Sequence, residues 1–185
     1  SHEIRTPLNG VLGMAQAMAA DDLSPVQRQR LGVIRESGET LTAILNDILD
    51  LSKIEAGRLE IEALDFDLGV TLHTCHATFL PLAQQKGLSL DLDVTPDAAG
   101  TYIGDAVRLR QVLYNLLSNA VKFTDQGGVV LTAERTEGLL RLTVTDTGIG
   151  IAPDQMDKLF ARFVQIDGAS TRRHGGTGLG LAISQ

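Results

Sequence analysis

The sequence predicts an α+β protein in which a helical hairpin is followed by an α/β sandwich. In the first sixty residues, apolar side chains recur at spacings of three and four, which is the pattern of amphipathic helices. From Leu59 the pattern changes, and segments that alternate between apolar and polar residues are interspersed with further helical segments. We therefore expect a first domain at residues 1–58, a linker at 59–66 and a second domain at 67–185.

The composition is that of an acidic globular protein. The chain has 185 residues, of which 43% are hydrophobic, and a formal net charge of −7. A non-specific nucleic-acid binder would need a basic surface, so we expect no nucleic-acid partner. The single cysteine, Cys75, excludes an internal disulfide framework and fits a reducing compartment.

The sequence shows no membrane segment. No apolar run approaches the roughly 20 residues that a membrane span needs, and no signal-peptide pattern opens the chain. We therefore expect this part of the protein to be cytoplasmic and to make no membrane contact. Because the chain stops at Gln185 within a continuing pattern, we interpret it as a fragment truncated at both ends. Its parent protein would be either soluble or membrane-anchored.

Residues 1–58 are predicted to form two helices. Ser24 followed by Pro25 predicts the start of the second helix, and Gly57 predicts its end. The first helix carries a heptad seam of apolar residues spaced alternately by four and three: Ile4, Leu8, Val11, Ala15 and Met18.

Two helices of this length cannot bury a wide apolar stripe against each other alone. A pair of such hairpins from two chains would bury it in a four-helix bundle, so we expect a homodimer. The alternative is that the hairpin packs on the second domain of its own chain.

The linker at 59–66 is predicted to contain a first strand, because Leu59-Glu60-Ile61-Glu62 alternates. In the second domain, Asp67 is expected to cap a helix that runs toward Lys86. Helices that cover one face of a sheet would give a mixed α/β sandwich. The other expected elements are a strand at 88–94, a helix at 105–123, a strand hairpin at 129–135 and 139–145, a short helix around 154–160 and a helix from 179 onward.

Three clusters in the second domain carry candidate chemistry. Asn115 and Asn119 are four residues apart and share a helix face, with Lys122 about one turn further on. Amide oxygens can ligate Mg²⁺, which usually keeps substrate phosphates as co-ligands, and a lysine suits the phosphate charge. Alone, this cluster would be interpreted as a solvated polar face.

The second cluster, Asp146-Thr147-Gly148-Ile149-Gly150, directly follows a predicted strand. Its glycines permit close backbone approach, and its carboxylate can accept a hydrogen bond from an exocyclic amine such as that of adenine. The alternative is an ordinary turn. The third cluster, Gly175-Gly176-Thr177-Gly178-Leu179-Gly180-Leu181, opens the last predicted helix, whose free N–H groups suit anions. It matches neither a Walker loop nor a dinucleotide fingerprint, so it is weak evidence when taken singly.

In this order, and together with the opening stretch, the clusters resemble the sensor histidine kinases of two-component signalling. The resemblance covers nearly the whole chain, and the string Val11-Leu12-Gly13-Met14 is especially similar to hybrid kinases, which carry their own receiver domain. The motifs similar to those of the family are the H box at 2–9, the N box at 111–124, the first glycine box at 146–150, the phenylalanine box at 160–163 and the second glycine box at 176–181.

The resemblance implies a role for the opening stretch. His2 would be the phospho-acceptor that attacks the γ-phosphate of ATP, and Glu3 would be the base that removes the ring proton. The phosphoryl group would pass to an aspartate of a receiver domain, in a response regulator or in the same polypeptide. Thr6 would position a water molecule for hydrolysis of the receiver's phosphoryl group, if the kinase is also a phosphatase.

The resemblance also implies an ATP-binding domain of the Bergerat or GHKL type that uses Mg²⁺. Asn119 would ligate Mg²⁺, while Asn115 and Lys122 would orient the phosphates. Asp146 would bind the adenine, and residues 151–177 would form a lid over the nucleotide. The other residues implied at the nucleotide are Gly148, Gly150, Phe160, Phe163, Arg172, Gly176, Thr177, Gly178, Leu179 and Gly180.

Two other functions fit parts of the sequence. ATPases of the gyrase, Hsp90 and MutL kind resemble this chain in the N box, but they place a glutamate where Asn115 stands. Because an amide cannot act as a general base, Asn115 disfavours direct hydrolysis of ATP by this domain. The second alternative is a non-catalytic dimerisation and docking module, although every motif residue that catalysis requires is present. His73, Cys75 and His76 are too few for a metal site and are interpreted as ordinary helix residues.

Overall fold

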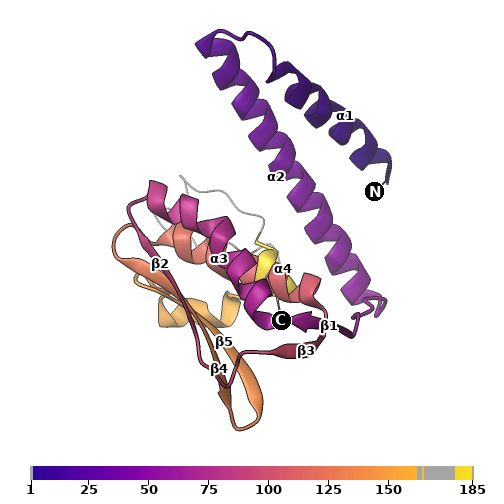
Figure 1. The fold of residues 1–185 in the computed structure, drawn as a ribbon. Coiled ribbons are helices and arrows are strands. Elements are labelled where there is room, and N and C mark those ends of the chain that lie inside the picture. Colours follow the sequence, from indigo (N-terminus) through magenta and orange to yellow (C-terminus); the bar gives the residue numbers. More distant parts are fainter. Residues whose placement is uncertain (1, 162–163, 165–177, 185) are drawn as a thin grey trace. The chain divides into compact units, whose positions relative to one another are not determined.

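The structure is a computed structural model that describes residues 2–161, 164 and 178–184 (Figure 1). The chain divides into two compact units, Ser1–Leu59 and Glu60–Gln185. The first unit is helical, and the second combines helices with two small sheets. In the described part of the chain, no helix combines the length and the apolar character needed to cross a membrane.

The first unit is a hairpin of helices α1 (His2–Met18) and α2 (Pro25–Glu55). The predicted start of α2 is confirmed. The Ser24 hydroxyl accepts a hydrogen bond from the Gln27 N–H at 3.4 Å, and the Ser24 N–H donates to Gln27 Oε1 at 2.9 Å. This capping box satisfies amide donors that the first turn of a helix leaves unpaired. Gly57, with a φ of +63°, follows the end of α2 as predicted.

The two helices approach each other closely at Gly38. A Cβ added to Gly38 would lie only 2.6 Å from Leu12 Cδ2, so the leucine of α1 packs directly on the backbone of α2. The helices are also joined by a hydrogen bond of 3.0 Å from the Arg5 guanidinium to Asn46 Oδ1. These contacts hold the two helices together within one chain.

Much of the predicted seam stays exposed within this unit. Among its members Ala15 is buried, whereas Ile4, Val11 and Met18 are 51%, 53% and 45% exposed. A single hairpin therefore leaves a stripe of apolar surface in contact with water. Exposed apolar residues of α2 are Val26, Val33, Ile34, Leu41, Ile48 and Ile54.

The second unit contains two sheets. In the smaller one, β1 (Leu64–Asp67) pairs antiparallel with β3 (Thr101–Gly104). In the larger one, β2 (Ser89–Val94) runs parallel to β4 (Gly128–Thr136), which pairs antiparallel with β5 (Leu139–Asp146). The strand order is β2-β4-β5, so β2 is an edge strand in the described part of the sheet. The predicted hairpin of β4 and β5 is confirmed.

Helices α3 (Leu68–Gln85) and α4 (Ala106–Phe123) lie side by side over one face of the larger sheet (Figure 1). Their apolar side chains and the inward-facing residues of the strands form one core, so the predicted α/β sandwich is confirmed. A 3₁₀ helix, η1 (Pro153–Lys158), and a short helix, α5 (Gly180–Ile183), follow β5. Fully buried core side chains include Leu72, Leu113, Leu117, Val129 and Leu131.

The first strand predicted in the linker at 59–66 is present as β1, but it begins at Leu64, and the alternating residues 59–62 are not a strand. Its partner β3 was not predicted. Such four-residue strands are decided by their pairing with a distant segment, more than by their own apolar pattern. Ahead of β1, the Glu62 N–H instead donates to Asp105 Oδ2 at 3.3 Å. The short helix expected around 154–160 is the 3₁₀ helix η1.

Candidate functional site

Asp105 fixes where α4, the helix of the amide cluster, begins. Its Oδ1 accepts hydrogen bonds from the backbone N–H groups of Val107 and Arg108, both at 3.0 Å. These bonds, above all the one from Arg108, hold the pKa of the Asp105 carboxyl below its usual value. The cap confirms the predicted helix start and sets the position of every later residue along α4.

Asn115 lies against the glycine-rich segment. Its Nδ2 donates to Gly180 O at 3.0 Å and to Ser184 Oγ at 3.3 Å. A Cβ added to Gly180 would lie 3.2 Å from Asn115 Cγ, so a glycine suits this close approach. Leu179, the preceding residue, is almost completely buried and holds the segment in place. The structure thus brings the first and third clusters into direct contact.

Asn119 and Lys122 follow Asn115 along α4, and both are half-buried. Lys122 Nζ lies 4.8 Å from the centre of the Phe123 ring. Burial lowers the pKa of Lys122, because the ammonium loses part of its hydration. A bound anion would favour the charged ammonium of Lys122 again, so Lys122 is suited to bind a phosphate at this position.

The second cluster turns back onto the end of α4. The Gly148 N–H donates to Asp146 Oδ1 at 2.8 Å, and the Ile149 N–H donates to Phe123 O at 3.3 Å. A Cβ added to Gly148 would come within 2.5 Å of Phe123 O, so only glycine fits there without a shift of the backbone. Gly150 has a φ of +67°, which glycine adopts without strain. All three clusters therefore meet at α4, with the Asp146 side chain exposed at the end of β5.

Two threonines at this junction belong to the predicted motifs, but no role was predicted for either. Thr147 Oγ1 donates to Gln126 O at 2.9 Å and accepts from the Gly128 N–H at 3.0 Å, which ties the second cluster to the turn before β4. Thr124, directly after α4, is fully buried, and its hydroxyl lacks a hydrogen-bond partner among the described residues. The position of Thr147 between the end of a predicted strand and a glycine could have predicted that its hydroxyl hydrogen-bonds to backbone groups of a turn.

The other predicted site residues are described only in part. His2 opens α1, and Thr6 lies about one turn later on its exposed surface. The side chains of His2 and Glu3 lie outside the described part of the structure. Phe160 is 48% exposed, and Gly178 has a φ of +67°. Four further predicted residues lie outside the described ranges: Phe163, Arg172, Gly176 and Thr177.

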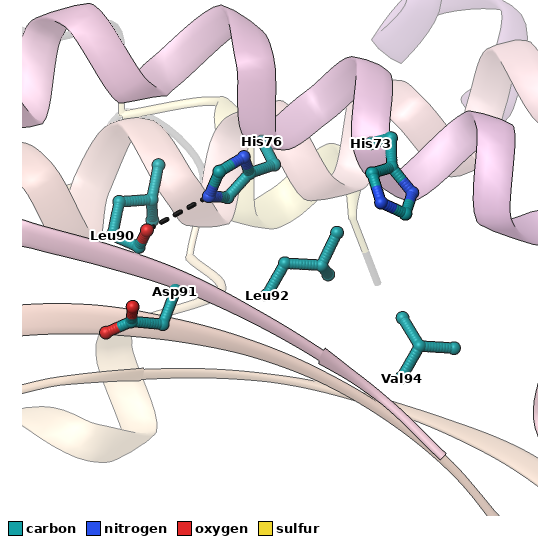
Figure 2. A pocket seen from close by; sticks show the side chains of 6 residues that line it. All are labelled: His73, His76, Leu90, Asp91, Leu92 and Val94. Carbon is teal, nitrogen blue, oxygen red and sulfur yellow. Dashed lines mark hydrogen bonds between the residues drawn. The ribbon is translucent and has the colours of Figure 1, made fainter. Parts of the chain in front are cut away.

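A hollow between α3 and β2 is lined by two histidines (Figure 2). Each contacts a backbone carbonyl: His76 Nε2 lies 2.9 Å from Leu90 O, and His73 Nδ1 lies 2.8 Å from Gly69 O. Cys75, which lies between the two histidines in the sequence, is fully buried, and this burial raises the pKa of its thiol. No group of three or more His, Cys, Asp or Glu side chains that could hold a metal ion is present among the described residues.

Two protein-family descriptions match this chain. Residues 1–57 match the His Kinase A (phospho-acceptor) domain, and residues 104–185 match the histidine kinase-, DNA gyrase B-, and HSP90-like ATPase family. The chain belongs to the histidine kinases. Because a phospho-acceptor domain precedes the ATPase-like domain, the chain is a histidine kinase core and not a gyrase-like or Hsp90-like ATPase.

The kinase core is similar to parts of longer proteins. It is 43% identical over 190 residues to the signal transduction histidine-protein kinase BarA of Escherichia coli K12, and this alignment covers 100% of this chain and 21% of BarA. It is 44% identical over 189 residues to the autoinducer 2 sensor kinase/phosphatase LuxQ of Vibrio parahaemolyticus, and that alignment covers 99% of this chain and 22% of LuxQ. The chain therefore spans about a fifth of the length of these curated relatives.

The fold is also similar to a solved kinase. The crystal structure of full-length ShkA in complex with AMPPNP matches with a TM-score of 0.79 at 40% sequence identity. The match covers 98% of this chain and 38% of the ShkA chain, so it includes both units of the histidine kinase core.

Proposed function

We propose that this kinase core binds ATP together with Mg²⁺ and transfers the γ-phosphoryl group to His2. The observation that carries the proposal is the meeting of three predicted clusters at α4. Asn115 contacts Gly180, and Phe123 O contacts both Gly148 and Ile149. The match to an ATPase family and the likeness to ShkA, which was solved with AMPPNP, support ATP as the nucleotide.

The described side chains at α4 fit a nucleotide and its metal ion. The exposed carboxylate of Asp146 would accept a hydrogen bond from the exocyclic amine of adenine. Lys122 would supply positive charge to the phosphates. Asn119 would offer an amide oxygen, a donor that Mg²⁺ accepts beside phosphate oxygens and water. When bound, Mg²⁺ would neutralise charge on the phosphates. Asn115 would keep the glycine-rich segment beside them, because its Nδ2 donates to Gly180 O.

The chemistry on the first unit is a nucleophilic displacement at phosphorus. A neutral imidazole nitrogen of His2 forms a bond to the γ-phosphorus, while the bond from that phosphorus to the β,γ-bridging oxygen breaks and ADP leaves. The ring N–H proton passes to Glu3, which acts as the general base. Histidine is suited to this role at neutral pH, because its ordinary pKa of about 6.5 leaves most of the imidazole uncharged.

We also propose that two chains associate through their hairpins. Ile4, Val11 and Met18 leave an apolar stripe exposed on α1, and α2 exposes Leu41 and Ile48 in the same way. A second hairpin would cover both stripes in a four-helix bundle. The match of residues 1–57 to a phospho-acceptor domain supports this arrangement.

The phosphoryl group would pass from His2 to an aspartate of a receiver domain, either in a separate response regulator or in the same polypeptide. The name of LuxQ, a sensor kinase/phosphatase, also supports a phosphatase activity that removes the phosphoryl group from the receiver domain. For that activity we propose Thr6, which is exposed on α1 one turn after His2, as the residue that positions the attacking water.

The first experiment incubates the full-length protein with Mg²⁺ and ATP labelled at the γ-phosphate, beside a His2→Ala variant. We expect protein-bound label that is lost in acid and kept in base, as a phosphoramidate behaves, and no label on His2→Ala. Asp146→Asn should weaken ATP binding, whereas Asp93→Asn, the same change on the exposed side of β2, should not. ATP binding without labelling would favour the docking module, and absence of ATP binding would refute the proposal.

A further inference from the structure

We infer that Lys86 is a positioning residue for the ATP site, because its side chain links the turn after α3 to the end of α4. This inference rests on the proposed function. Lys86 Nζ donates hydrogen bonds to three backbone oxygens: Val121 O at 2.8 Å, Lys122 O at 2.9 Å and Thr124 O at 3.1 Å. An ammonium group has three N–H donors, so these bonds use its full capacity.

The carbonyls at the end of α4 need such a donor. The last four C=O groups of an α-helix have no partner within the helix, and the helix dipole concentrates partial negative charge there. Thr124, with a φ of −102° and a ψ of 123°, has already left the helical conformation, so the helix does not continue to satisfy them. Lys86 places a positive charge among these oxygens and thereby fixes the last turn of α4.

The backbone that carries Lys86 is itself held in place. The Lys86 N–H donates to Ala83 O at 3.0 Å, and the Leu88 N–H donates to the same oxygen at 3.0 Å. The Gly87 N–H donates to Gln84 O at 2.9 Å, and Gly87 has a φ of +71°. These bonds close α3 with a glycine in the left-handed region. The ammonium is therefore tethered to an ordered turn and not to a free loop.

The segment that Lys86 holds supports the ATP site in two ways. It contains Lys122, whose side chain is proposed for the phosphates. It also contains Phe123, whose carbonyl oxygen accepts from the Ile149 N–H and lies against Gly148. A displaced last turn of α4 would therefore move Lys122 and the support of the adenine-side glycines together, although Lys86 touches neither phosphate nor adenine itself.

The test compares Lys86→Met and Lys86→Arg with the wild type in the full-length protein. Lys86→Met keeps much of the side-chain length but removes the charge and all three donors. We expect its ATP affinity to fall about 10-fold and the amide of Ile149 to exchange faster with deuterated water, because its acceptor Phe123 O is no longer fixed. Lys86→Arg keeps the charge and several donors, so it should restore part of both.

Leu140→Ala is the matched control for a general loss of stability. Leu140 packs against the core from β5. None of the described hydrogen bonds joins it to Lys86 or to the end of α4. This variant should lower the melting temperature while leaving ATP affinity and Ile149 exchange unchanged. Equal effects in Leu140→Ala and Lys86→Met, or unchanged affinity and exchange in Lys86→Met, would overturn the inference. A wild-type protein that fails to bind ATP would refute the proposed function instead, and the exchange at Ile149 would still test the link to α4.

Discussion

The two units differ in how much of their apolar surface they bury by themselves. The α/β unit encloses one continuous core, in which Leu117 and Leu131 are fully buried. The hairpin buries Ala15, Leu31 and Leu51, but other apolar residues of both helices stay in contact with water, among them Ile4 at 51% and Leu41 at 44% exposure. A unit with a complete core is stabilised by its own contacts, whereas a unit with an exposed seam gains from a partner. The nucleotide site and the association surface that we propose thus lie in different units of the chain.

The largest effect is expected from truncating the core of the α/β unit. Leu117→Ala should lower the free energy of unfolding of that unit by about 2–5 kcal/mol, because it removes a fully buried side chain and leaves a cavity. Ile48→Ala, at a position 41% exposed on α2, should change the stability of the hairpin by about 0.5 kcal/mol or less as long as the protein is monomeric. Urea denaturation measures both values.

The same pair of variants sharpens the comparison when self-association is measured by sedimentation. Ile48→Ala should weaken dimerisation, whereas Leu117→Ala should not do so under conditions in which the protein stays folded. An Ile48→Ala variant that associates as strongly as the wild type would show that the exposed apolar stripe of α2 is not the dimer surface.

A second contrast uses two glycines, one in each unit. Gly148→Ala places a methyl group within 2.5 Å of Phe123 O, which should cost about 1–3 kcal/mol and weaken ATP binding as the backbone shifts. Gly10→Ala meets nothing within 4 Å on α1, so it should stabilise the hairpin by about 0.5–1 kcal/mol through its better helix propensity. Thermal denaturation and ATP titration of both variants check this. A tolerated Gly148→Ala would contradict the close packing described for the glycine cluster.

A third contrast compares the helix caps of the two units across pH. Asp105→Ala and Ser24→Ala should each cost about 1 kcal/mol near neutral pH, because each removes the side-chain acceptor at a helix N-terminus. The pKa of Asp105 is lowered in the folded protein, so its contribution is fully present above the unfolded value of about 3.9 and is lost as the pH falls through the lower folded pKa. The cost of Asp105→Ala should therefore shrink in acid, measured by urea denaturation from neutral pH downward, while that of Ser24→Ala should not.

The smallest effects are expected at two ion pairs on the surface. Arg35 and Glu39 lie 3.6 Å apart on α2, and Arg141 and Glu134 lie 3.7 Å apart across β5 and β4. Glu39→Gln and Glu134→Gln should each lower stability by about 0.5 kcal/mol or less, with even less effect at high salt. Denaturation in low and high salt tests this, and a loss above about 1 kcal/mol from either variant would mean that the pair is less exposed to solvent than described.

The sequence predicts features whose signal lies in neighbouring residues. Ser24, Asp67 and Asp105 each cap a helix that begins where it was predicted, because a cap acts within one turn of the chain. The hairpin of β4 and β5 was also predictable, since its alternation is long and its two strands are adjacent in sequence.

Features that join distant segments were not predictable in the same way. The pairing of β1 with β3 and the hydrogen bonds of Lys86 to Val121 and Thr124 depend on tertiary packing, which leaves no local pattern. The motif resemblance names Asn115 and Gly180 as site residues, but their direct contact becomes visible only in the folded chain. The roles of His2 and Glu3 stay predictions.

The edge strand β2 has a consequence for the protein at high concentration. Asp91 and Asp93 are exposed along it, and His76 contacts the Leu90 carbonyl. An edge strand offers backbone groups to which another strand can add, and acidic side chains along it oppose that addition, because two copies would bring their carboxylates together. A dimer formed through the hairpins would hold two such sheets at a high effective concentration. The acidic side chains of Asp91 and Asp93 would therefore oppose strand-to-strand aggregation at this edge.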